Sequence, residues 1–366
     1  MCVNVLPVNS TFLSSMLYEG YLRYRLHEDL CNAFNTVRDY IKAGDRVPRP
    51  FFPVHRNDRT ALGRLLNWSG RDFFEDDLIT AFNNVCSRYS IQDDSLEVVI
   101  KRTVMLIGGK RAQYAAPQFL KADRYTGLNN LFDNLVTQQI KIQLAPETYL
   151  LGLIGLYSSY VVRNVREGMY YMLTFAPDTT IMLIDADPDK LDTYFSIKNA
   201  VADDLRKILS ETTFLESWIL ELLMNTSISA MLYSKGLDKI SLILFKLAFE
   251  GGRAYKIYET NQVEIYKDIP CINILRNYTS NPYSVIENLH EFISDIARRV
   301  GRPDSKEYSN LINALHGLYE FIVLGNPVGF HVFSREIMDS YEKLKDENPR
   351  IASMYRGILR KLSYSI

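Results

Sequence analysis

The sequence is poor in the side chains that build metal and redox centres. Its 366 residues include four cysteines, at positions 2, 31, 86 and 271, and five histidines. No two cysteines lie within four residues of each other, which excludes a Cys-x-x-Cys pair for zinc or dithiol chemistry. Four scattered cysteines are also too few for a disulfide-stapled secreted fold, so we expect buried free thiols. The sequence therefore predicts no metal site and no cofactor.

Long apolar runs are also absent. The most apolar stretch, residues 149–162, contains two glycines and ends at Arg163 after about 14 residues, which is too short to cross a bilayer. The first residues of the chain have no Lys or Arg ahead of their apolar part, unlike a signal peptide. We expect a cytoplasmic protein with no membrane partner.

Neither sign of charge is in excess. The chain has 42 Lys and Arg against 43 Asp and Glu, a net charge of -1. This balance excludes a protein that is basic over its whole surface, but it is compatible with a local basic face. The composition, 47% hydrophobic and 23% charged, is that of a globular protein. Because the length exceeds the roughly 250–300 residues at which one core stops growing, we expect two domains.

Catalytic motifs are missing as well. Gly109-Lys110 resembles the end of a P-loop, but Val104 stands where that motif needs a glycine, and Arg111 replaces the Ser or Thr that holds magnesium. His290 lacks the second histidine, four residues on, that a zinc-binding helix needs. No serine elbow and no Cys–His pair stand out. The sequence predicts that the protein is not an enzyme and has no catalytic residues.

One acidic cluster leaves two interpretations open. Asp178, Asp185 and Asp187, followed by Lys190, approach the pattern of a metal-dependent nuclease, although Lys190 lies three residues after Asp187 instead of two. The alternative is that Asp187 or Asp189 caps the next helix, where an acid is favoured by the helix dipole. Capping is the interpretation that we favour.

Hydrophobic periodicity predicts a helix-dominated α+β protein with a mixed N-terminal part, residues 1–281, that holds a small sheet, and a C-terminal helical bundle, residues 282–366. The expected N-terminal helices are 11–43, 72–88, 147–167 and 188–225. The expected strands are 96–107, 170–175 and 181–184, with a short hairpin of 254–258 and 263–266, whereas 240–249 is open between a helix and a buried strand. The expected bundle helices are 284–300, 305–324, 334–345 and 349–362, separated by short Gly, Pro and Asn breaks.

Positive charge gathers in two stretches of the first third of the chain. Residues 46–71 carry six arginines against one acid, with Phe51, Phe52 and Trp68 interleaved, and residues 101–127 carry six basic residues against one acid. Arg and Lys neutralise phosphates, while aromatic rings accept stacked bases. We therefore predict a nucleic-acid-binding site made up of Arg46, Arg49, Arg56, Arg59, Lys110, Arg111, Tyr114, Lys121, Arg124 and Tyr125. The alternative is a pair of solvated basic loops that balance acids elsewhere in the fold.

Three segments carry a family resemblance. Residues 109–127 (GKRAQYAAPQFLKADRYTG), 254–259 (AYKIYE) and 318–327 (LYEFIVLGNP) resemble the large subunit of archaeal subtype I-A CRISPR interference (Cascade) complexes. The likeness is spread over most of the chain and includes no catalytic motif. It implies a mixed N-terminal part and a helical C-terminal part. Some relatives carry a four-cysteine zinc site that this chain lacks, so the resemblance does not change the expectation of no metal.

The resemblance also implies partners. Such a subunit works in antiviral defence beside a guide RNA, backbone subunits, a small helical subunit and a helicase–nuclease. It contacts target DNA near the flanking motif, either as duplex or as the displaced strand, while the guide RNA reads the sequence. The competing hypotheses are a metal-dependent nuclease that uses Asp178, Asp185 and Asp187, and a scaffold whose helical tail binds only proteins.

Overall fold

The computed structural model describes residues 2–41, 48–91, 96–101, 104–108, 112–125, 141–212, 214–252, 254–269, 272–276, 279–300 and 305–365. The chain forms two compact units. Unit 1 is made of Met1–Lys198 and Ser241–Val263, and unit 2 is made of Asn199–Ile240 and Glu264–Ile366. The division therefore passes through the helix α7 (Pro188–Leu209) and the strands β8 (Lys239–Glu250) and β9 (Ala254–Tyr266).

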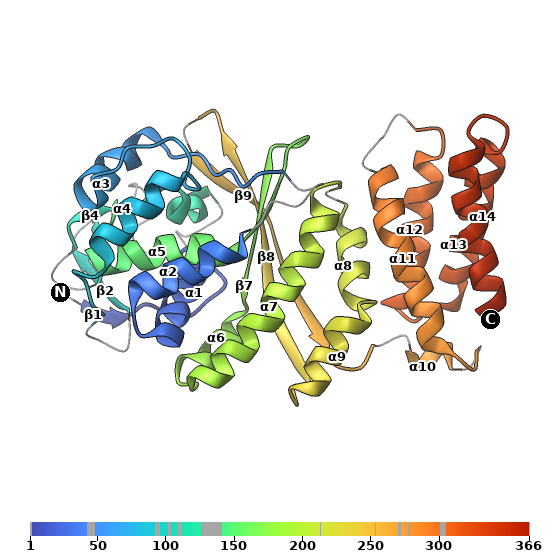
Figure 1. The fold of residues 1–366 in the computed structure, drawn as a ribbon, viewed down its shortest axis with the longest axis horizontal. Helices are drawn as coiled ribbons and strands as arrows, with labels where there is room; N and C mark the ends of the chain where they lie inside the picture. Colours follow the sequence, from blue (N-terminus) through green and yellow to red (C-terminus); the bar gives the residue numbers. More distant parts are fainter. Residues whose placement is uncertain are drawn as a thin grey trace. The chain divides into compact units, whose positions relative to one another are not determined.

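Unit 1 begins with a small sheet and the helices that follow its strands (Figure 1). In chain order its elements are β1 (Cys2–Val5), α1 (Phe12–His27), α2 (Leu30–Tyr40), α3 (Arg56–Leu66), α4 (Asp76–Cys86), β2 (Glu97–Lys101), β3 (Val104–Ile107), β4 (Tyr114–Ala115), the 3₁₀ helix η2 (Gln118–Tyr125), β5 (Lys141–Leu144) and α5 (Pro146–Ser159). The strand order among the described residues is β1-β2-β3-β5-β4. Strands β3 and β5 are parallel, and the other neighbouring pairs are antiparallel.

A second sheet has the order β6-β7-β8-β9. Its first two strands are β6 (Tyr160–Asn164) and β7 (Met169–Phe175), and the helix α6 (Pro177–Ile184) follows them. Strand β7 is antiparallel to both neighbours, in a register that runs from Met169 opposite Ala248 to Phe175 opposite Leu242. Both faces of β7 are buried, which explains its nearly continuous apolar sequence.

Helices α1 and α5 pack against each other at the centre of unit 1. They approach so closely that a Cβ atom at Gly20 would overlap the carbonyl oxygen of Leu151, and a Cβ atom at Gly155 would overlap that of Met16. Such a crossing requires glycine on both helices. A residue distant in sequence caps the N-terminus of α1. The carboxylate of Asp123 in η2 accepts the N–H groups of Phe12 and Leu13, which have no acceptor within the helix, at 2.9 and 2.8 Å.

Unit 2 is helical apart from the strand ends that it shares with unit 1. Besides the rest of α7, its helices are α8 (Leu215–Leu223), α9 (Thr226–Ser234), α10 (Ile272–Leu275), α11 (Pro282–Val300), α12 (Tyr308–Ile322), α13 (Pro327–Leu344) and α14 (Pro349–Ser365). Helices α11 to α14 run side by side (Figure 1). Helices α12 and α13 again meet at glycines, because a Cβ atom at Gly317 would lie 2.7 Å from the carbonyl oxygen of Gly329.

The helix-dominated α+β class is confirmed, and so are the four C-terminal helices. Helix α13 begins earlier than expected, at Pro327, because the side chain of Asn326 accepts the N–H of Val328 and starts the helix there. The boundary expected after residue 281 does not coincide with the two compact units, since residues 199–240 and 264–281 belong to the same unit as the bundle.

Three helix and strand predictions in the first half were wrong. The described part of the segment expected as one helix over 11–43 forms two helices, because Glu28 ends α1 in a left-handed conformation and Asp29 caps α2. The helix expected from residue 72 begins at Asp76, since the Asp72 carboxylate accepts the N–H groups of Phe52 and Phe74 instead. Residues 181–184 belong to α6 and not to a strand, because Pro177 occupies the first helical turn.

Other boundaries moved at strands. Residues 96–107 form two paired strands, β2 and β3, instead of one. The helix expected over 147–167 ends at Ser159, and β6 follows at once. The segment left open at 240–249 is the strand β8, and the expected hairpin of 254–266 is one continuous strand, β9.

The expectation of free thiols was wrong for two of the four cysteines. Cys31, in the first turn of α2, forms a disulfide with Cys86 at the end of α4, and the two Cα atoms are 5.4 Å apart. This separation is within the range that disulfides require. The sequence separation of 55 residues concealed the pair from any reading of local cysteine spacing.

Candidate nucleic-acid interface

The structure describes about half of the predicted binding residues. Arg46, Lys110 and Arg111 lie outside the described residues, as do the side chains of Arg124 and Tyr125. Arg49 and Arg56 are exposed, and Arg59 is half-buried. Tyr114 is half-buried against Tyr149, and Lys121 is buried.

Residues 49–71, which we call the arginine segment, are fixed at both ends by a short antiparallel ladder. The N–H of Val54 donates to the carbonyl of Arg71 at 2.7 Å, and the N–H of Phe73 donates to the carbonyl of Phe52 at 2.9 Å. Phe52 and Phe73 are fully buried, so the ladder is attached to the core. The hydroxyl of Tyr255 adds a hydrogen bond to the carbonyl of Pro53. The segment therefore presents its exposed arginines from a rigid base.

Most aromatic rings of the basic stretches serve the core instead of the surface. Phe52 stacks on Tyr255 with ring centroids 4.5 Å apart, and Phe119 packs edge-on against Phe52. Trp68 is only 6% exposed. Among the rings described in the arginine segment, Phe51, at 37%, is the exposed one. Apolar rings in these loops thus anchor the loops, and Phe51 is the ring that a base could reach.

Sequence reasoning missed two members of this surface. Arg71 was counted in the basic stretch but not among the predicted site residues, although it is exposed. Arg163, in β6, lies with its guanidinium 4.9 Å from the centre of the Phe51 ring, within the range of a cation–π contact. It also lies 5.5 Å from the Tyr170 ring. No local signal pointed to Arg163, because it stands in an apolar strand far from the arginine segment in sequence.

Acidic residues share the neighbourhood of the arginines. A groove of about 780 Å³ lies between α3 and α4 and has Arg64 and Arg88 on its walls together with Glu75 and Asp77. Glu75 accepts the N–H groups of Arg71 and Asp72 at 3.0 and 3.1 Å. The groove is therefore of mixed charge, and acids also adjoin the ladder, where Glu75 accepts the N–H of Arg71 and Asp72 lies near Arg49.

Asp58 links the arginine segment to the core through a buried carboxyl. Its Oδ2 accepts the N–H of Gln118 at 3.0 Å, and the side chain is 2% exposed. Burial raises the pKa of Asp58 to about 7, against the lowering effects of the Gln118 hydrogen bond and of Lys121. Lys121, predicted to bind phosphate, thus has a buried acid as its neighbour.

We expect Asp58→Asn to flatten the pH dependence of stability. Because the folded-state pKa is above the unfolded value of 3.8, Asp58 favours folding below that value, and this contribution is lost as the pH rises towards 7. As the pH rises from 4 to 8, the free energy of unfolding of the variant should increase relative to that of the parent by on the order of 2 kcal/mol. Urea unfolding across that range measures the difference. Parallel pH profiles of the two proteins would contradict the raised pKa.

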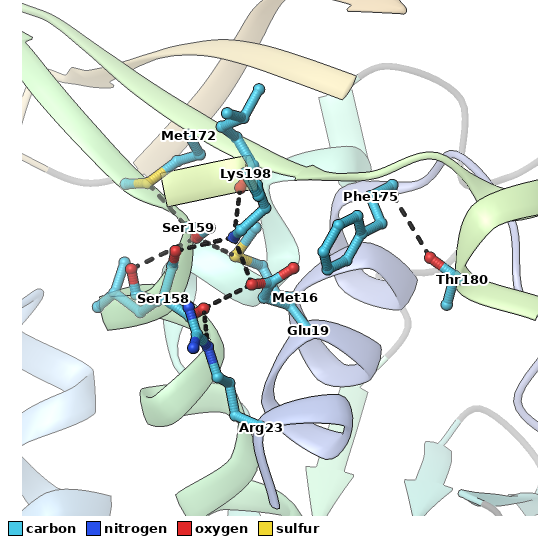
Figure 2. Close-up of polar contacts among 11 residues, drawn as sticks. Met16, Glu19, Arg23, Ser158, Ser159, Met172, Phe175, Thr180 and Lys198 are labelled. Carbon is cyan, nitrogen blue, oxygen red and sulfur yellow. Dashed lines mark hydrogen bonds and ion pairs between the residues drawn. The ribbon is translucent and has the colours of Figure 1, made fainter. Parts of the chain in front are cut away.

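A second buried polar network joins α1, α5, β7 and α7 (Figure 2). Lys198 pairs with Oε1 of Glu19, and its Nζ also donates to the carbonyls of Ser158 and Leu173 at 2.9 and 3.2 Å. The hydroxyl of Ser158 donates to Glu19 at 2.5 Å and accepts Nε of Arg23 at 2.8 Å. Burial lowers the pKa of Lys198 to about 8 and that of Arg23 to about 10.

This network lacks the access that a reactive site needs. The side chains of Glu19 and Lys198 are each 1% exposed, and the guanidinium of Arg23 is covered by the ring of Phe195 at 3.5 Å. A perturbed lysine pKa marks functional sites only when the group also faces a cleft. The geometry therefore indicates a structural role, in which one buried ion pair fixes four elements relative to one another.

The acidic cluster caps helices. Asp178 lies in the first turn of α6, Asp185 is the C-cap of α6, and Asp187 accepts the N–H of Lys190 at 2.8 Å at the start of α7. In the part of the chain that the structure describes, no group of three His, Cys, Asp or Glu side chains is placed to hold a metal ion. The helix-capping interpretation of Asp187 is confirmed.

Comparison with known proteins gives one full-length relative. No family model matches the chain, and no solved structure matches it significantly. None of the described helices has the length and apolar character that crossing a bilayer requires. An uncharacterized protein of Archaeoglobus fulgidus is 30% identical over 394 aligned positions, which cover 98% of each chain. The chain therefore belongs to the same family as this archaeal protein.

Proposed function

We propose that the protein is a non-catalytic nucleic-acid-binding subunit of an archaeal CRISPR interference complex. In this role it contacts target DNA near the flanking motif and the displaced strand, and it bridges to partner subunits around the guide RNA. The observation that carries the proposal is the arginine segment, whose exposed arginines are presented from a core-anchored ladder. The resemblance of three segments to the large subunits of such complexes supplies the biological setting.

The arrangement suits phosphate recognition. Arg71 is a residue of the ladder and Arg49 lies shortly before it, and both are exposed. A guanidinium group can donate two parallel hydrogen bonds to the oxygens of one phosphate. Phe51 and Arg163 add an aromatic ring and a cation that contact each other. A nucleobase can stack on such a ring while the cation binds a neighbouring phosphate. A rigid base lowers the entropy cost of binding, since the backbone of the segment is already ordered.

Salt dependence provides the test. We expect the double variant Arg49→Ala/Arg71→Ala to bind a labelled DNA about 10- to 100-fold more weakly than the parent at low salt. The slope of log Kd against log salt concentration should fall by about 2, since each lost phosphate contact removes about one counterion. The matched control is Arg350→Ala/Arg356→Ala, two exposed arginines on α14.

Three outcomes would contradict the proposal. One is an equal loss of DNA affinity in the control variant, which would show that the effect comes from the lower net charge and not from the position of the arginines. The second is the absence of measurable binding to single- or double-stranded DNA, which would favour the protein-binding scaffold. The third is cleavage of the DNA on addition of magnesium or manganese, which would favour the nuclease that uses Asp178, Asp185 and Asp187.

A further inference from the structure

The Cys31–Cys86 disulfide stands at the edge of a small helix–helix interface. Helices α2 and α4 meet through the stacked rings of Phe34 and Phe82, with centroids 3.9 Å apart, and through a 3.1 Å hydrogen bond from Asn83 to Asn35. The disulfide lies about one turn away from these contacts on each helix. The interface thus combines packing of buried side chains, an amide hydrogen bond and one covalent bond.

Both helices are also attached to the core of unit 1. Helix α2 is fixed there through Phe34, whose ring also packs on Tyr157 at 4.7 Å. Helix α4 buries Leu78 and Val85 in the same core and exposes Asp76 and Asp77 on its other face. It also forms one wall of the groove that contains Arg64 and Arg88. A change that loosens α4 therefore alters this groove first.

We propose that the Cys31–Cys86 disulfide is a redox-sensitive clamp that holds α4, and with it one wall of the groove, against α2. The arginine segment lies inside the 55-residue loop that the bond closes. The Val54–Arg71 and Phe52–Phe73 ladder does not depend on the clamp, because backbone hydrogen bonds join its two segments directly. Reduction should therefore make local opening of α4 easier while the ladder stays in place.

The chemistry is a thiol–disulfide exchange with a dithiol, either a small molecule or a protein of the thioredoxin type. Cys86 is 1% exposed and Cys31 is half-buried, so a thiolate of the dithiol attacks the sulfur of Cys31. The S–S bond breaks, and Cys86 leaves as a thiolate that takes a proton from water. The second thiol of the dithiol then attacks the mixed disulfide and releases Cys31, so that two electrons pass from the dithiol to the protein.

Amide hydrogen exchange on oxidised and dithiol-reduced protein tests the clamp. We expect the amides of α4 to exchange roughly tenfold faster or more after reduction. Without the covalent link to α2, α4 can open locally at a lower free-energy cost. The amides of Val54 and Phe73 should change less than about twofold. Titration of the thiols confirms that reduction is complete. Equal exchange of α4 in the two states would overturn the proposal.

The double variant Cys31→Ala/Cys86→Ala separates the clamp from other effects of the reductant. It retains the cysteines at positions 2 and 271. Its α4 amides should exchange as in the reduced parent and should not respond to the dithiol. A response of the variant equal to that of the parent would show that another group is the target and would overturn the proposal. The comparison of exchange rates between the oxidised and the reduced parent remains a test of the clamp even if the variant fails to fold.

The consequence for binding rests on the proposed function. We expect reduction to change binding of the labelled DNA by less than about twofold at low salt, because Arg49 and Arg71 stand at the ladder, which stays in place. Faster exchange of α4 without DNA binding in either redox state would support the clamp and contradict the proposed function. DNA binding together with equal exchange of α4 in the two redox states would support the proposed function and contradict the clamp.

Discussion

Replacing Gly155 by alanine should destabilise unit 1 by about 3 kcal/mol or more, and Gly20→Ala should do the same. Each added Cβ would overlap a backbone carbonyl of the facing helix, and a carbonyl cannot rotate away as a flexible side chain can. Helices α1 and α5 would have to separate, which would open the core on both sides of the crossing. The same argument applies in unit 2 to Gly317 and Gly329.

The two tryptophans allow each unit to be followed alone. Trp68 is buried in unit 1 and Trp218 in unit 2, so Trp218→Phe leaves a fluorescence signal for unit 1 and Trp68→Phe leaves one for unit 2. Unfolding by guanidinium of each glycine variant, made together with Trp218→Phe or Trp68→Phe, measures the loss in the free energy of unfolding of the unit concerned.

Gly357 is the matched control for these glycines. It lies in α14 with no atom within 4 Å of an added Cβ. Gly357→Ala should therefore stabilise unit 2 by about 0.5–1 kcal/mol through helix propensity. A Gly155→Ala variant as stable as its parent would show that the α1–α5 crossing has room to relax.

The second large effect is expected at the buried ion pair. Lys198→Met should cost about 3–5 kcal/mol, because it leaves the Glu19 carboxylate buried without its counter-charge. One oxygen of this carboxylate, Oε2, already has no hydrogen-bond partner. Adding Glu19→Gln to Lys198→Met should recover about half of that loss, since the unpaired carboxylate is then gone and Ser158 keeps an acceptor, while the Arg23 guanidinium stays buried beside it.

The control for Lys198 stands on the same helix. Lys207 pairs with Asp204 at 2.7 Å, but its side chain is 63% exposed, so Lys207→Met should change stability by less than about 0.5 kcal/mol. A double-mutant cycle on Glu19 and Lys198, followed through Trp68 fluorescence, yields the coupling energy. Losses that simply add would show that the two side chains are not coupled in the folded protein.

Features that depend on neighbouring residues were predictable from the sequence. The four C-terminal helices were found because Pro, Gly and Asn breaks separate periodic segments, and Asn326 and Asn348 of two breaks accept N–H groups at the starts of α13 and α14. The break at Glu28 was missed, although Asp29 carried a usable N-cap signal. Residues 181–184 were misread because a short apolar run fits both a strand and a helix, although Pro177 carried a usable helix-start signal.

Features that depend on pairs distant in sequence were not predictable. The Glu19–Lys198 pair and the Cys31–Cys86 bond form only once the fold brings separate helices together. For the candidate site, charge counting identified the exposed arginines Arg49 and Arg56. It could not separate surface rings from core rings, because Phe51 and Phe52 are adjacent and only the tertiary contacts distinguish them.

The discontinuity of unit 1 has a consequence for synthesis. The ribosome delivers β6 and β7 first, then residues 199–240 of the other unit, and only afterwards β8 and β9. Until β8 arrives, the edge of β7 that will pair with it, from Met169 to Phe175, is an unpaired apolar strand. Such an edge is the kind of surface on which nascent chains associate wrongly. The nascent protein is therefore most vulnerable to aggregation in the interval between the emergence of β7 and that of β8.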